Sequence, residues 1–260
     1  MRRDNIFWGV TLILFGILFL LQERGIIGNV FEFFWPIILI LVGGWIVLGV
    51  FWKPAPGSIE SFQIPLGAAK SVRYKFSHGA AQIHISGGAP TGQALVGSEA
   101  VGMNRHSHLD GDRLEVRVDA GPSFIPFVGP ADGAWRYQIT QEVPVTLSIE
   151  AGASAFNVDL KDVQASHIEL KVGASSINVT VPARGVSRLE VEGGAASFNL
   201  HIPDGVAARI VTHEGFTALS VDKDRFPQLD SGIHQSPDFD NAPNRTEINV
   251  KAGMGSVTVK

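Results

Sequence analysis

Two long apolar runs open the sequence, and alternating apolar and polar positions fill most of the remaining chain. Residues 6–21 are uncharged over 16 positions, and residues 33–52 are uncharged over 20. Helices of those lengths extend ~24 and ~30 Å at ~1.5 Å per residue, close to the ~30 Å hydrocarbon core of a bilayer. The pattern therefore predicts a transmembrane helical hairpin over residues 1–53, with spans at about 6–21 and 33–52.

The two runs share a repeated phrase, since FWGVTLILFG at residues 7–16 recurs as FWPIILILVG at residues 34–43. Each copy places Trp near the membrane interface and ends in a glycine, Gly16 or Gly43. In antiparallel helices both glycines would lie near the middle of the bilayer, where small residues let helix backbones approach. We expect them to pack against other helices; the alternative is that they face lipid as tolerated residues.

Basic residues flank the hairpin unevenly. Arg2 and Arg3 precede the first run and Lys53 follows the second, whereas the connecting stretch has Arg24 beside two glutamates. The positive-inside rule therefore predicts that both termini are cytoplasmic. A cleaved signal peptide is the alternative for the first run, but no small-x-small cleavage site follows it and a second span comes next.

A Pro/Gly-rich linker, residues 54–58, separates the hairpin from a domain at residues 59–260 in which apolar positions alternate. Glycines in matching contexts recur every 21 residues in this domain, at Gly152, Gly173, Gly194 and Gly215. Alternation on both sides of each glycine predicts two strands per repeat, each with one apolar face. Further copies of the pattern surround Gly79 and Gly253, outside the 21-residue register.

One repeat is too small to be stable alone. Its ~5 inward side chains contribute ~1.5–3 kcal/mol each, whereas fixing its backbone costs ~1–2 kcal/mol per residue. Stacked repeats share hydrogen bonds and one apolar core. We therefore predict an all-β domain after the hairpin, a β-solenoid-like rack of two facing sheets. Residues 121–135 and 222–247 are expected to cap its ends, with partner binding as the alternative for the first segment.

Charge, composition and motifs argue against several classes of function. The net charge is -4, so the chain is a poor nucleic-acid binder. It contains no cysteine, which excludes disulfides, thiol nucleophiles and cysteine-ligated metals. The sequence contains no P-loop, GxGxxG or HExxH motif, and its Gly-Ala-Ser serines recur with the repeat. We assign no catalytic, cofactor-binding or metal residues and expect a protein that is not an enzyme.

Two polar groups remain as candidates for binding. Three asparagines recur at one repeat position, Asn157, Asn178 and Asn199, where alternation places them on the outer face. They would form a stabilising ladder, or alternatively bind a polar ligand such as a sugar. His106 and His108 would need a third ligand, such as Asp110, to bind a metal, and the Asp-Gly that follows favours a hairpin turn instead.

The two parts of the chain together resemble a known pairing. RRDNIFWGVTLILFGILFLL and FWPIILILVGGWIVL are similar to the LiaI/LiaF-type transmembrane region of bacterial membrane proteins. The glycine-turn repeats and the closing NRTEINVKAGMGSVTV resemble the C-terminal domain of LiaF-like proteins and related toast-rack, adhesin-like domains. The chain departs from four-helix members of this family in having two expected spans.

The resemblance implies a non-enzymatic regulator or scaffold of the bacterial cell-envelope stress response. Such a protein resides in the cell membrane and restrains a membrane sensor histidine kinase by direct contact. One alternative is a self-assembling, adhesin-like or structural scaffold, which would associate with its own copies. A third possibility is a carbohydrate-binding β-solenoid that uses the outer polar face.

Overall fold

A computed structural model of the chain describes residues 20, 22–25, 60–99, 103–120, 134–213 and 218–260. The chain divides into two units, residues 1–55 and residues 56–260. Among the residues that the structure describes, no helix has the length and apolar character needed to cross a membrane.

Several expectations fall outside the described residues. Apart from Leu20, both expected spans do so, and with them Gly16, Gly43 and the linker at residues 54–58. The repeat glycine Gly215 and most of the 121–135 segment also lie outside.

The described part of the second unit is built from strands and turns. It contains β1 (Glu60–Pro65), β2 (Ser71–Gly87), β3 (Gln93–Glu99), β4 (Met103–Asp110), β5 (Arg113–Ala120), β6 (Ala134–Ile139), β7 (Val145–Asp159), β8 (Ala165–Thr180), β9 (Val186–His201), β10 (Ala207–Thr212), β11 (Ala218–Val221), β12 (Gln228–Asp230), β13 (Ile233–Gln235) and β14 (Arg245–Val259). Within the described residues all of them belong to one 14-stranded hydrogen-bonded sheet. The unit is therefore all-β where it is described.

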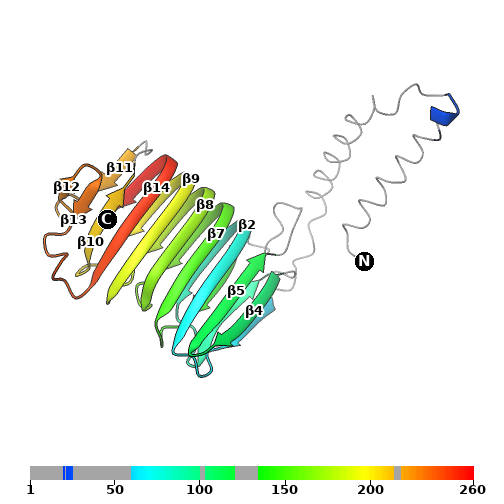
Figure 1. The fold of residues 1–260 in the computed structure, drawn as a ribbon, viewed down its shortest axis with the longest axis horizontal. Coiled ribbons are helices and arrows are strands. Elements are labelled where there is room, and N and C mark those ends of the chain that lie inside the picture. The colour runs from blue at the N-terminus through cyan, green and yellow to red at the C-terminus, as the bar shows by residue number, and fades with distance from the viewer. Residues whose placement is uncertain (1–19, 21, 26–59, 100–102, 121–133, 214–217) are drawn as a thin grey trace. The chain divides into compact units, whose positions relative to one another are not determined.

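The long strands stack in parallel, in the order β2, β7, β8, β9 and β14 (Figure 1). Along β7, β8 and β9 the paired residues are 21 positions apart, as in the row Phe156, Ile177 and Phe198. The three residues of this row point inward and are buried. The residues that alternate with such inward positions along each strand are mostly exposed. The alternation in the sequence thus corresponds to one buried and one exposed face on each strand.

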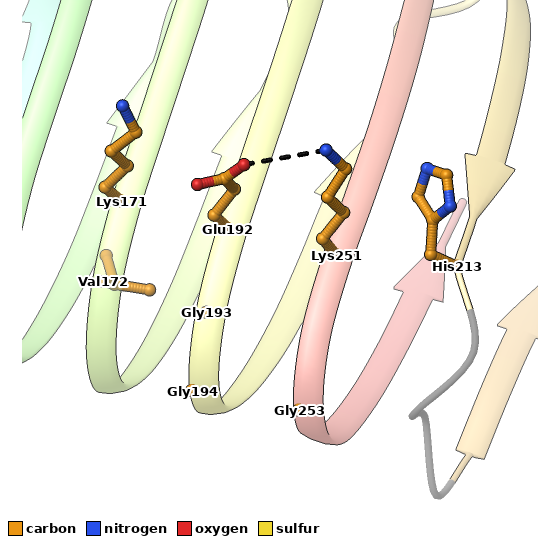
Figure 2. A pocket seen from close by; sticks show the side chains of 8 residues that line it. All are labelled: Lys171, Val172, Glu192, Gly193, Gly194, His213, Lys251 and Gly253. Carbon is orange, nitrogen blue, oxygen red and sulfur yellow. Dashed lines mark ion pairs between the residues drawn. The ribbon is translucent and has the colours of Figure 1, made fainter.

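Each long strand bends at a glycine, so that its two halves lie in facing layers (Figures 1 and 2). We call the layer of the N-terminal halves the first layer and the layer of the C-terminal halves the second. The bends form a row, because a Cβ on Gly152 would lie 2.8 Å from the carbonyl oxygen of Gly79, and a Cβ on Gly194 would lie 3.2 Å from that of Gly173. A side chain would clash with the neighbouring backbone at Gly152, and would fit only tightly at Gly194.

The space between the layers is filled by apolar side chains. The rings of Phe76, in the first layer, and Tyr137, in the second, have centroids 4.8 Å apart. Tyr74 also reaches across, and its hydroxyl donates a hydrogen bond to the carbonyl oxygen of Ala94. The core is therefore shared by both layers, and every repeat contributes to it.

At the last end the order of the stack differs from the order of the chain. After β9 the chain forms β10 and β11, which pair in parallel with β14 and not with β9. β14 lies between, and pairs Val257 with Phe198 of β9, 59 positions earlier. The copy around Gly253, outside the 21-residue register in the sequence, is therefore in spatial register with the others.

Additional strands extend the stack at both ends. At the first end β6, β3 and β1 extend the second layer, while β5 and β4 extend the first. At the last end the β12–β13 hairpin pairs with β10. Within residues 222–247, Phe226 is fully buried in the core, and Arg225 donates hydrogen bonds to the carbonyl oxygens of Ile202 and Pro203.

Candidate interaction surface

The outer face of the first layer carries charged side chains of both signs on neighbouring strands. Cross-strand and neighbouring residues form ion pairs there, namely Arg73–Glu115 at 3.4 Å, Lys75–Glu150 at 3.1 Å, Lys171–Glu169 at 2.6 Å, Arg188–Glu247 at 2.8 Å and Lys251–Glu192 at 3.8 Å. Most of these side chains are substantially exposed, so each pair contributes little to stability, typically about 0–1 kcal/mol. Their effect is a patterned surface with its charges largely balanced.

Hydrogen bonding shifts the pKa values of one ion pair on this face. Hydrogen bonds, from the Lys171 ammonium first and the Ser148 hydroxyl second, lower the pKa of the Glu169 carboxyl, although partial burial opposes them. The same bond to Glu169 raises the pKa of Lys171. The bond thus favours the charged form of both groups.

A shallow, open groove follows the bends next to this face (Figure 2). One hollow of about 600 Å³ has backbone at Gly194 and Gly253 as its floor, and Lys171, Glu192 and Lys251 project above it. A second hollow of about 610 Å³, around Gly79, shares Lys171 with the first. We call the two together the glycine-edge groove. Glycine backbone forms part of its floor, beside the Val172 side chain, so a partner can approach the backbone at Gly194 and Gly253 closely.

Alternating charge runs along the groove. Register places Glu150, Lys171, Glu192 and Lys251 in one row across β7, β8, β9 and β14. His213 follows β10 and lines the same hollow (Figure 2). Neighbouring strands are ~4.8 Å apart, so negative and positive side chains alternate along the row at about that spacing. Such a row favours a partner whose own charges alternate with a similar spacing.

The outer face of the second layer is chemically different. Asn157, Asn178 and Asn199 lie side by side there and are exposed, as the alternation predicts. Asn199 Nδ2 donates a 3.0 Å hydrogen bond to Asn178 Oδ1. In the next row the hydroxyls of Ser197 and Ser256 are 3.0 Å apart. These ladder contacts give the asparagines a structural role, and they leave the sugar-binding alternative as a hypothesis.

The other candidates from the sequence occupy structural positions. His106, His108 and Asp110 are exposed on β4, and the described residues contain no group of three or more His, Cys, Asp or Glu side chains arranged to hold a metal. The expected hairpin joins β4 to β5, with Gly111 at a φ of 58°. The Ser175 hydroxyl lies within hydrogen-bonding distance of the Gly152 carbonyl oxygen, at 3.5 Å, so this serine braces the bend.

His78, which the motifs in the sequence did not single out, is buried next to the bend of β2. Its ring lies 5.7 Å from that of Trp135, and its Nε2 is 3.5 Å from the Tyr137 hydroxyl oxygen. Burial lowers the pKa of His78 to about 4, although the Asp119 carboxylate opposes this shift. The sequence pattern could have identified His78, because this residue occupies the next inward position after Tyr74 and Phe76.

Comparison with family models accounts for this architecture. Residues 53–201, more than half of the chain, match the N-terminal domain of toast_rack, DUF2154. The chain belongs to the toast-rack family. Residues 6–47 of this toast-rack protein match the LiaI-LiaF-like transmembrane region. The resemblance inferred from the sequence is thereby confirmed, and the chain is a membrane protein.

A solved structure shows the same fold. A candidate cell adhesion protein from Clostridium sporogenes ATCC 15579 is 15% identical, with a TM-score of 0.69 over 77% of this chain and 97% of its own. A candidate adhesin from Bacteroides fragilis NCTC 9343 is 10% identical, with a TM-score of 0.28 over 79% of this chain and 99% of its own. A search of curated proteins finds no match.

The pairing of a LiaI-LiaF-like transmembrane region with a toast-rack domain supports a membrane-anchored scaffold. Neither family is known for catalysis.

Proposed function

We propose that this protein is a non-enzymatic scaffold that regulates a membrane sensor histidine kinase in the bacterial cell-envelope stress response. One observation carries the proposal: a LiaI-LiaF-like transmembrane region and a toast-rack domain occur in a single chain. A protein built in this way can contact a kinase both within the bilayer and beside it.

The proposed mechanism joins two contacts. The hairpin of residues 1–53 packs against transmembrane helices of the kinase through Gly16 and Gly43. The domain after the linker at residues 54–58 acts as one solenoid-like rack, whose 21-residue repeats and two facing layers hold the glycine-edge groove in a fixed shape. Because the groove carries alternating charges on a rigid support, it suits a charged helix of the kinase outside the membrane.

Co-purification tests the membrane contact. Replacing both Gly16 and Gly43 with leucine should reduce recovery of the kinase, because larger side chains prevent close helix packing. The matched control is Gly44→Leu, since this position lies about 100° around the same helix from Gly43. Unchanged recovery with the double variant would remove the two glycines from the interface.

The proposed topology places both termini in the cytoplasm, where the rack can reach a kinase domain. Ser231 is exposed in the turn between β12 and β13, and the chain contains no native cysteine. A Ser231→Cys variant should therefore resist an impermeant maleimide in intact cells and react after lysis. Labelling of intact cells would place the rack outside and exclude contact with a cytoplasmic kinase domain.

A second candidate is a self-assembling adhesive scaffold. It is favoured by the likeness of the fold to a candidate cell adhesion protein from Clostridium sporogenes. In this case racks would associate through their end strands, and deletion of the gene would leave envelope-stress transcription unchanged. The regulator proposal expects the opposite transcriptional result, so one deletion strain separates the two functions.

A further inference from the structure

The outer face of the second layer has a central region without charge, which we call the neutral face. Three rows of exposed or half-buried side chains form it: Ala174, Ala195 and Met254; Ala155, Ser176, Ser197, Ser256 and Ala218; and Asn157, Asn178, Asn199, Thr258 and Ser220. The first layer of the same strands carries Glu or Lys at most outward positions near the bend. The outer faces of the two layers, built from the same strands, therefore differ in charge.

We propose that the neutral face binds the neutral face of a second copy of this chain. In a two-fold contact the same patch of each copy faces the other copy. A row of like charges would then repel its counterpart, whereas alanine, serine and asparagine do not. Met254, with 68% of its surface exposed, supplies an apolar side chain that such a contact would bury.

The size of the face sets the strength of the contact. Five strands at ~4.8 Å spacing and three rows at ~6.8 Å along the strands give about 400–500 Å² on each copy. The total, about 800–1,000 Å², is below the ~1,200–2,000 Å² of stable interfaces. A freely diffusing domain would therefore dimerise weakly.

Membrane anchoring compensates for a weak contact. Tethering converts association into an encounter at high effective concentration, of the order of mM for short linkers. The proposal rests on the membrane anchor and not on the kinase, so a dimer can form in the purified chain. The balanced charges of the first layer lie on the opposite face of these strands and would stay accessible in such a dimer.

Cross-linking in the Cys-free chain tests this contact. Ser176→Cys and Ser197→Cys place thiols on the adjacent strands β8 and β9, at the centre of the neutral face. The full chain, in vesicles of phosphatidylethanolamine and phosphatidylglycerol, is treated with a short bis-maleimide. Ser148→Cys on the first layer is the matched control, and reaction with a simple maleimide corrects for thiol accessibility. We expect about tenfold more covalent dimer from the neutral face than from the control.

A charge variant completes the test. Asn178→Glu combined with Ser197→Cys should lower the dimer yield about tenfold, because each copy then brings a carboxylate into a contact that has no opposite charge. Ser148→Glu combined with Ser197→Cys should leave the dimer yield unchanged.

Equal dimer yields from Ser197→Cys and Ser148→Cys would overturn the proposal. Binding of a soluble neutral β-glucan by a chain that stays monomeric would also overturn it and assign the face to a carbohydrate. Neither the cross-linking result nor the glucan-binding result depends on whether the kinase is recovered with the chain.

Discussion

A Cβ atom on Gly173 would lie 2.8 Å from the carbonyl oxygen of Gly152 on the neighbouring strand. This contact is shorter than real Cβ contacts. It recurs at 2.8 Å for Gly152 and lengthens to 3.2 Å for Gly194. At Gly79, the first of the row, an added Cβ meets nothing within 4 Å. The glycines are therefore required by their neighbours and not by an unusual φ.

Alanine substitutions can separate these two situations. Gly173→Ala should lower the free energy of unfolding by about 1–3 kcal/mol, the usual cost of overpacking. Gly79→Ala, the matched control, should change stability little, because space is available there. Thermal and urea unfolding of the detergent-solubilised chain would measure both variants. Equal destabilisation would show that the bend itself, and not the close approach of neighbours, selects glycine.

His78 makes the stability of the domain depend on pH. Burial lowers its pKa from 6.5 to about 4, so the unfolded chain takes up a proton more readily than the folded chain. Its stabilising contribution is therefore fully present above pH 6.5 and is lost as the pH falls towards 4. The difference corresponds to about 3 kcal/mol.

Urea unfolding between pH 4 and 7 would measure this effect. His78→Gln should flatten the pH dependence of the free energy of unfolding, because the buried titrating group is removed. The exposed His84, on the outer face of the same strand, provides the control. A His84→Gln variant should keep the original slope. If the slope survives His78→Gln, another group is responsible.

The last end of the rack depends on one aromatic side chain. Phe226 is fully buried, and the Arg225 guanidinium lies 4.9 Å from the centre of its ring. Phe226→Ala should cost about 3–5 kcal/mol, as expected for loss of a buried aromatic side chain. Leu229, 64% exposed in the same segment, is the control, and its replacement by alanine should change stability by less than about 0.5 kcal/mol. Differential scanning calorimetry would distinguish the two.

Sequence periodicity predicted the local structure well. Alternation identified the inward positions, such as Phe156 and Ile177, because a strand sends successive side chains to opposite faces. It also placed Asn178 and Asn199 on the outer face. The 21-residue spacing gave the register of β7 to β9, since equal repeats in a stack pair position by position.

The order of the stack could not be predicted in the same way. Insertion of β14 between β9 and β10 depends on which edge completes the core best, and this is a property of the assembled layers. The two hollows of the groove also depend on assembly, because Lys171 and Lys251 come from strands that are far apart in the sequence. His78 could have been found, since a polar residue at an inward position contradicts the alternation.

Charge reversal tests the glycine-edge groove. Lys171→Glu with Lys251→Glu would make the row from Glu150 to β14 uniformly acidic, and should strongly reduce kinase recovery, since like charges across an interface disfavour binding. The lost ion pairs contribute only about 0–1 kcal/mol each, and like charges on neighbouring strands cost roughly 0.2–1 kcal/mol per pair, so a modest loss of stability is expected. Arg73→Glu, on the same layer near the first end, is the control and should retain the kinase. Thermal unfolding verifies the fold, and recovery unchanged by the double reversal would show that the kinase does not use the groove.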